Sequence, residues 1–98
     1  MIIKIKDYVD GDTAISYDDG KRCYEKILKI LGTDGKVILD FDGVNYVITA
    51  FLNPIIGDLI INNGNDVMKN VEIKNATVNV IEKIKLVKDG ALLKRGDM

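Results

Sequence analysis

The sequence predicts a small α/β domain, in which helices pack on a mixed, mostly parallel sheet of about four strands. The chain has 98 residues, of which 47% are hydrophobic and 30% are charged, with one proline. This length and composition describe a single globular domain that spans residues 1–98. Apolar residues with strand spacing and with helix spacing follow one another along the chain, and this alternation favours parallel strands with packed helices.

The first half of the chain contains two predicted strands with a helix between them. Residues 2–6 alternate apolar and lysine side chains, as in a half-exposed strand. Ser16 can cap a helix that ends at Gly32, and Gly20 lies on the apolar stripe of that helix. A glycine on the stripe suggests that the helix backbone packs closely against a sheet. Residues 36–41 are mostly apolar and predict a buried central strand.

A second predicted helix follows the central strand. Thr49 is expected to cap it, and its regular turns must begin close to residues 49–51, because Pro54 lacks an amide donor. Apolar residues fill most of its positions, so we expect it to be largely buried. These residues are Phe51, Leu52, Ile55, Ile56, Leu59 and Ile60.

The last predicted elements are a strand and a helix. Residues 71–74 alternate as a strand does, and Asn75 or Thr77 is expected to cap the helix that follows. This helix is predicted to end at Gly90, which leaves residues 91–98 as a frayed tail. Its predicted apolar stripe consists of Val78, Ile81, Ile84 and Val87.

The charge balance and the cysteine content limit the cellular location and the classes of partner that we expect. The chain has 14 basic and 15 acidic residues, which provide no strong field for nucleic acid or an anionic membrane. No segment approaches the roughly 18 apolar residues of a membrane span, and the N-terminus lacks the apolar stretch of a signal peptide. The single cysteine, Cys23, cannot form an intramolecular disulfide. We therefore expect a cytoplasmic protein that binds neither nucleic acid nor membrane.

Few residues are suited to catalysis. The chain has no histidine and one thiol, so it cannot supply a Ser–His or Cys–His pair, or the ligands of a structural zinc site. Asp40 and Asp42 follow the central strand, where ligands bind in α/β sheets, but two carboxylates are a weak signal for Mg²⁺. We expect no catalytic residues, no cofactor and no metal. An enzyme that uses Asp40 and Asp42 is an alternative hypothesis.

Four segments carry a resemblance to a known family. They are residues 16–22 (SYDDGKR), 37–44 (VILDFDGV), 47–53 (VITAFLN) and 56–57 (IG). Together they resemble the bacterial STAS-like domain family, which is related to the anti-sigma factor antagonists and is largely uncharacterised. The resemblance implies a small α/β sandwich that binds a histidine-kinase-like ATPase. In the antagonists, that kinase phosphorylates a serine at the start of the second helix, and the phosphate releases the complex.

This chain differs from the antagonists at the phosphorylated position. The acceptor serine falls on Ala50, which has no hydroxyl, and the preceding serine falls on Thr49. Either Thr49 is the phosphoacceptor or the partner is bound constitutively.

The function that we expect is a non-enzymatic regulatory domain, similar to an anti-sigma factor antagonist, that contacts a kinase-like ATPase or another signalling protein. Its predicted partner-binding residues lie at the N-terminus of the second helix, and they are Thr49, Phe51, Leu52 and Asn53. The alternative is a small-ligand or nucleotide-binding module that uses the same N-terminus, because free amides there attract anions. A homodimer through the Ile3–Ile5 strand could coexist with either function.

Overall fold

The computed structural model of the protein describes residues 1–95, which form two parallel sheets and a layer of helices. The larger sheet has the strand order β1 (Ile2–Lys4), β3 (Val37–Asp40), β5 (Val71–Lys74), with both neighbouring pairs parallel. The smaller sheet pairs β2 (Thr13–Ala14) with β4 (Tyr46–Val47), also in parallel. The predicted α/β class with parallel pairing is confirmed, with the strands divided between two sheets.

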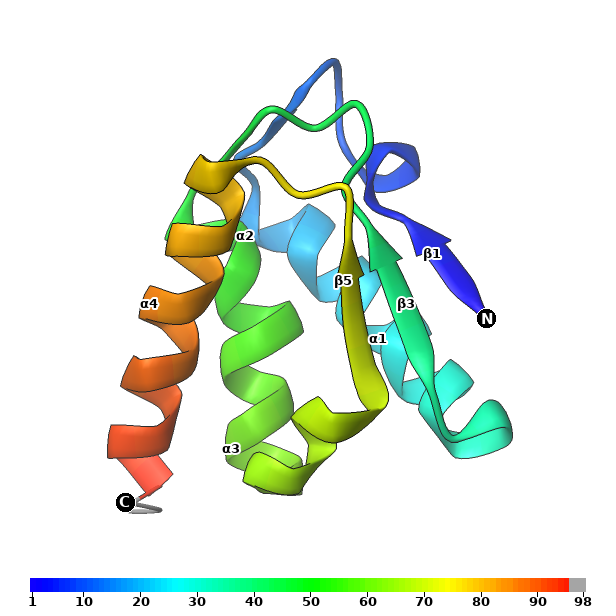
Figure 1. Ribbon diagram of the computed structural model, residues 1–98, viewed down its shortest axis with the longest axis vertical. Coiled ribbons are helices and arrows are strands. Elements are labelled where there is room, and N and C mark those ends of the chain that lie inside the picture. The colour runs from blue at the N-terminus through cyan, green and yellow to red at the C-terminus, as the bar shows by residue number, and fades with distance from the viewer. Residues whose placement is uncertain (96–98) are drawn as a thin grey trace.

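The helices lie side by side, as Figure 1 shows. α1 (Tyr17–Asp34) and α4 (Val78–Arg95) flank a continuous helical stretch of residues 49–63, which we call the central helix. The central helix consists of α2 (Thr49–Leu52), the π-helical η2 (Asn53–Asp58) and α3 (Leu59–Asn63). Short 3-10 helices η1 (Ile5–Tyr8) and η3 (Asn65–Asn70) complete the fold. Within residues 1–95, no helix combines the length and the apolar character that crossing a membrane requires.

One face of the larger sheet points into the core. Ile3, Val37 and Leu39 are buried there, whereas Ile2 and Lys4, which alternate with Ile3 along β1, are exposed. This pattern follows from the two-residue period of a strand, which sends successive side chains to opposite faces.

α1 begins as the sequence predicts and ends later. The hydroxyl oxygen of Ser16 accepts a hydrogen bond from the Asp19 amide at 3.3 Å, which caps the helix. The helix continues through Gly32 to Gly35, which has a φ of 78° and donates its N–H to the Leu31 carbonyl. The prediction that Gly32 ends the helix is wrong, because Gly35 provides the left-handed conformation that a helix C-terminus favours.

The central helix is largely buried, as predicted. The relative exposure of Phe51, Leu52 and Ile55 is 0%. Its middle turns widen to π-helical geometry at residues 53–58, where Pro54 lies. Proline cannot donate to the carbonyl one turn earlier and its ring crowds that turn, so a locally wider helix accommodates it.

Gly20 is the point of closest approach between α1 and the central helix. A Cβ at Gly20 would overlap the carbonyl oxygen of Phe51 and lie 2.8 Å from Cγ of Pro54. The prediction that the backbone packs closely at Gly20 is correct, but its neighbour is the central helix and not a sheet. The absence of a side chain at Gly20 therefore sets the spacing of these two helices.

The smaller sheet fixes where the central helix begins. The amide of Ile48 donates to the carbonyl of Ala14 at 3.0 Å, and the amide of Asn45 donates to that of Asp12 at 2.9 Å. Since β2 leads into α1 and β4 leads into the central helix, their pairing brings the first turns of these two helices to the same end of the molecule.

α4 differs from its prediction in two respects. The hydroxyl of Thr77 accepts from the Val80 amide at 3.3 Å, which confirms Thr77 as a cap, but the helix then passes Gly90 and continues to Arg95. The predicted frayed tail is therefore wrong for residues 91–95, where Ala91 is buried and anchors another turn. Residues 96–98 of that tail lie outside the described residues.

The buried stripe of α4 also differs from the predicted one. Val78 and Ile81 are 72% and 53% exposed, respectively. The residues of α4 that are buried are Val80, Ile84, Val87 and Ala91. Helical periodicity fits both stripes, and only the position of the central helix selects between them.

The spacing at Gly20 predicts opposite effects for two alanine substitutions in α1. Gly20→Ala should lower the free energy of unfolding by about 1–3 kcal/mol, because the new methyl group overpacks the contact with the central helix. Gly32→Ala is the matched control: in residues 1–95, a Cβ there meets no atom within 4 Å beyond its own turn and chain neighbours. It should raise stability by about 0.5–1 kcal/mol. Urea unfolding measures both, and equal effects would contradict the close approach.

Candidate functional site

The predicted contact residues of the second helix separate into two pairs. Phe51 and Leu52 are 0% exposed and belong to the hydrophobic core. Thr49 is half-buried and Asn53 is exposed, and both line a groove at the surface. The structure thus corrects the predicted surface: Phe51 and Leu52 face inward because the central helix is enclosed by α1 and α4, and neither can touch a partner.

Thr49 does not cap the helix as predicted. Ile48 occupies the N-cap position, and no side chain there accepts a capping hydrogen bond. Within the part of the chain that the structure describes, the Thr49 hydroxyl forms no hydrogen bond. A half-buried hydroxyl of this kind can bond to a group that arrives from outside.

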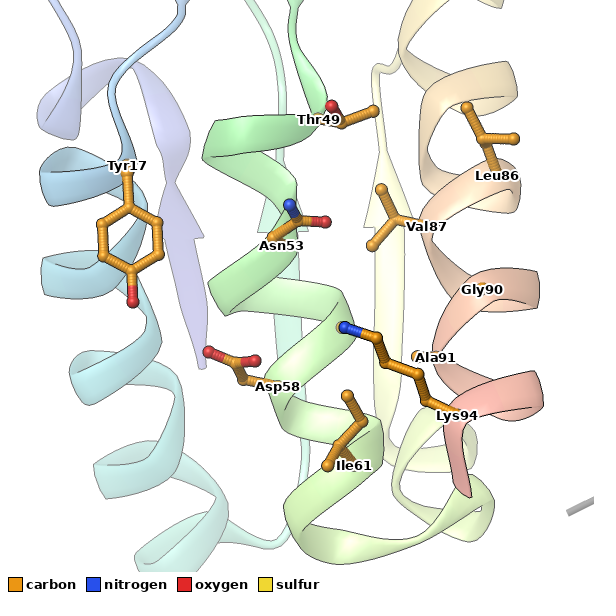
Figure 2. A pocket seen from close by; sticks show the side chains of 11 residues that line it. Tyr17, Thr49, Asn53, Asp58, Ile61, Leu86, Val87, Gly90, Ala91 and Lys94 are labelled. Carbon is orange, nitrogen blue, oxygen red and sulfur yellow. The ribbon is translucent and has the colours of Figure 1, made fainter. Parts of the chain in front are cut away.

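The groove that contains Thr49 and Asn53 runs between the central helix and α4, with Tyr17 of α1 at one side (Figure 2). Its volume is about 420 Å³. Close helix packing forms its floor, since a Cβ at Gly57 would lie 3.4 Å from Cγ1 of Val87. The lining residues are Tyr17, Thr49, Asn53, Gly57, Asp58, Ile61, Leu86, Val87, Gly90, Ala91 and Lys94.

The groove combines an apolar rim with a few polar groups. Leu86 and Tyr17 are 62% and 47% exposed and provide apolar surface on either side. Thr49 and Asn53 provide hydrogen-bonding groups between them, and Figure 2 shows both side chains on the side of the helix that faces the viewer. Asp58 and Lys94 contribute one charge of each sign. This mixture is typical of a protein contact surface, and it lacks the cluster of cations that a phosphate group favours.

Sequence reasoning missed the contributions of α1 and α4 to this groove. Tyr17 and Leu86 are far from Thr49 in the chain, and only the helix packing brings them together. Leu86 could have been noticed as a candidate contact residue, because it is a large apolar residue that lies outside the buried stripe of its helix.

Asp40 and Asp42 lie at the C-terminal end of β3, as predicted, and their interactions stabilise a turn. Oδ1 of Asp40 accepts hydrogen bonds from Nδ2 of Asn75 and from the amide of Asp42, both at 2.9 Å. Asn75 has a φ of 57°, and its bond to Asp40 ties the loop after β5 to the loop after β3. Among residues 1–95, no group of three or more His, Cys, Asp or Glu side chains is placed to hold a metal ion.

Cys23 lies inside the core, at 0% exposure. Burial raises the pKa of its thiol to about 12, with a smaller opposing effect from Arg22. The thiolate is the nucleophilic form of cysteine, so this side chain packs as a small apolar residue.

Asp40 generates a prediction for the pH dependence of stability. The hydrogen bond from Asn75, followed by that from the Asp42 amide, lowers the pKa of Asp40 below its usual value. A carboxyl group whose pKa is lower in the folded state stabilises the protein above its unfolded pKa of about 3.9, and this contribution is lost as the pH falls through the folded pKa. Asp40→Asn should therefore destabilise the protein more at about pH 7 than at about pH 2.5, as measured by urea unfolding.

The control for this prediction is Asn75→Ala, which removes the strongest of the stabilising hydrogen bonds. The pKa of Asp40, followed by carboxyl carbon NMR shifts, should rise towards its usual value in this variant. An unchanged pKa would show that the Asn75 bond does not stabilise the charged carboxylate.

Comparison with known families adds one finding. A family model described as a STAS-like domain of unknown function (DUF4325) matches residues 19–80, more than half of the chain. The match begins in the first turn of α1 and ends in the first turn of α4, so the α4 side of the groove lies outside it. A search of curated proteins and a search of solved structures gave no match.

Proposed function

Since the chain belongs to the family of STAS-like domains of unknown function, we propose that it is a non-enzymatic regulatory domain that binds a signalling protein. The contact surface in this proposal is the groove between the central helix and α4. The observation that carries it is the combination of exposed apolar residues with unbonded polar groups at the start of the central helix.

The chemistry of the groove supports a protein partner over a small anion. Its rim holds Leu86 and Tyr17, whose apolar surface a partner side chain would cover. Among the described side chains that line it, Lys94 is the one cation. A nucleotide would need several donors or cations around its phosphates, so the helix N-terminus is not sufficient support for the small-ligand alternative.

The partner class in this proposal comes from the resemblance to the anti-sigma factor antagonists. Such a partner would be a histidine-kinase-like ATPase, and the segment that corresponds to the phosphorylated loop contributes Thr49 to the groove. A phosphate on Thr49 would place about two negative charges in the contact and release the partner through the cost of desolvation. The adjacent Ala50 cannot take this role.

Substitutions on α4 test the surface with a matched control. Leu86 lines the groove and Leu93 does not, although both are exposed leucines of the same helix, at 62% and 65%. Leu86→Arg and Asn53→Arg should weaken binding of the native partner about tenfold, the effect of losing one contact of about 1.4 kcal/mol. Leu93→Arg should leave it unchanged.

The measurement begins with capture of proteins on the immobilised wild-type chain from a lysate of its own cells, followed by titration calorimetry of the purified partner. Equal affinity for the wild type, Leu86→Arg and Asn53→Arg would exclude the groove as the contact. In the same titrations, Thr49→Glu should weaken binding more than Thr49→Val, which removes only the hydroxyl, if phosphorylation of Thr49 is the release signal.

A further inference from the structure

β5 is an edge strand whose outer side carries unpaired backbone groups. In a parallel pair, alternate residues direct their N–H and C=O groups to the same neighbouring strand. The carbonyl of Lys74 accepts from the amide of Phe41 at 2.9 Å, so Lys74 and, by alternation, Glu72 bond towards the β3 side. Val71 and Ile73 therefore direct their backbone groups outward, where the sheet of residues 1–95 has no further strand. The Val71 amide donates to the Met68 carbonyl at the end of η3, so the groups open to a new strand are the carbonyl of Val71 and the amide and carbonyl of Ile73.

An apolar groove lies beside this edge. It has a volume of about 400 Å³ and is lined by Ile73, Asn75, Ala76, Ile81 and Ile84. Ile81 is 53% exposed, although it is a large apolar residue on the side of α4 that faces β5. Figure 1 shows α4 beyond β5 on the side away from β3. A strand added to β5 on that side would lie over this groove, and its inward side chains would cover Ile81.

The charges on the open face of the sheet define the chemistry of that strand. Lys74 is in register with the oppositely charged Asp40 of β3, whereas Glu72 is in register with the apolar Ile38. Within residues 1–95, Glu72 has no ion-pair partner. A cation on the added strand, directly opposite Glu72, would provide the missing partner.

The geometry points to a second binding surface, at which an extended segment of a partner protein adds to β5 as a fourth strand. The segment has apolar residues on the side that faces α4 and a lysine or arginine opposite Glu72. Main-chain hydrogen bonds to the carbonyl of Val71 and to the amide and carbonyl of Ile73 would provide the affinity, and the groove and Glu72 would provide the selectivity, as in other cases of strand addition. This inference does not depend on the groove between the central helix and α4.

The test uses synthetic peptides as probes. The peptide acetyl-STVKVTS-amide has valines for the groove and one lysine for Glu72, and its palindromic sequence fits in either strand direction. The control peptide is acetyl-STVEVTS-amide. In NMR titrations of the ¹⁵N-labelled chain, the lysine peptide should shift the amides of Val71 and Ile73 and bind about threefold more tightly than the control, as expected for one cross-strand charge pair.

Four variants separate the contributions of Glu72 and of the groove. Glu72→Lys, on the exposed face, should reverse the preference between the two peptides. Ile81→Lys should abolish binding of both, whereas Leu93→Lys, an exposed position on the same helix outside the groove, should not. Leu86→Arg, which tests the other surface, should have no effect. Circular dichroism of each variant establishes that it is folded.

Four results would overturn the inference. They are unshifted β5 amides at millimolar peptide, shifts confined to Thr49 and Asn53, an unchanged peptide preference in Glu72→Lys, and a concentration-dependent dimer that Ile81→Lys dissociates. The last result would replace the partner segment with a second copy.

Discussion

The contact between Gly20 of α1 and the central helix is the constraint on which the rest of the structure depends. A side chain at Gly20 would overlap the Phe51 carbonyl, so the two helices can lie this close only because the position is glycine. Gly57 lies where α4 crosses the other side of the central helix, and a Cβ there would be in van der Waals contact with Cγ1 of Val87, at 3.4 Å. The central helix is therefore held on both flanks by close contacts with its neighbours.

Because α1 and α4 enclose the central helix, their packing determines which of its residues a partner can contact. Phe51 and Leu52 fall inside, whereas the side of the helix that carries Thr49 and Asn53 reaches the surface. The exposed apolar side chains of α4 lie on two different surfaces. Leu86 borders the groove at the central helix, and Ile81 borders the groove beside the edge strand β5. One helix thus contributes to both proposed interactions, through different faces.

Local patterns in the sequence predicted the helices and strands well, but they predicted poorly which elements pack against one another. The Ser16 cap, the strand at residues 71–74 and the burial of the central helix depend on nearby residues or on composition, and all three are confirmed. The partner of Gly20, the inward position of Phe51 and the exposure of Ile81 depend on how the helices pack, which spacing alone does not specify. For the same reason, Thr49 and Asn53 could be placed near a site from sequence, whereas Tyr17 and Leu86 could not.

Amide hydrogen exchange, followed residue by residue by NMR, tests most directly whether the central helix stays packed between α1 and α4 until the whole protein unfolds. We predict that the amides of residues 55–60 exchange only through global unfolding, with the same free energy of opening as the buried turns of α1 around Ile27. Exchange of the central helix at a much lower opening free energy than α1 would contradict it. In that case Phe51 and Leu52 would become accessible without unfolding, and the contact surface would have to include them.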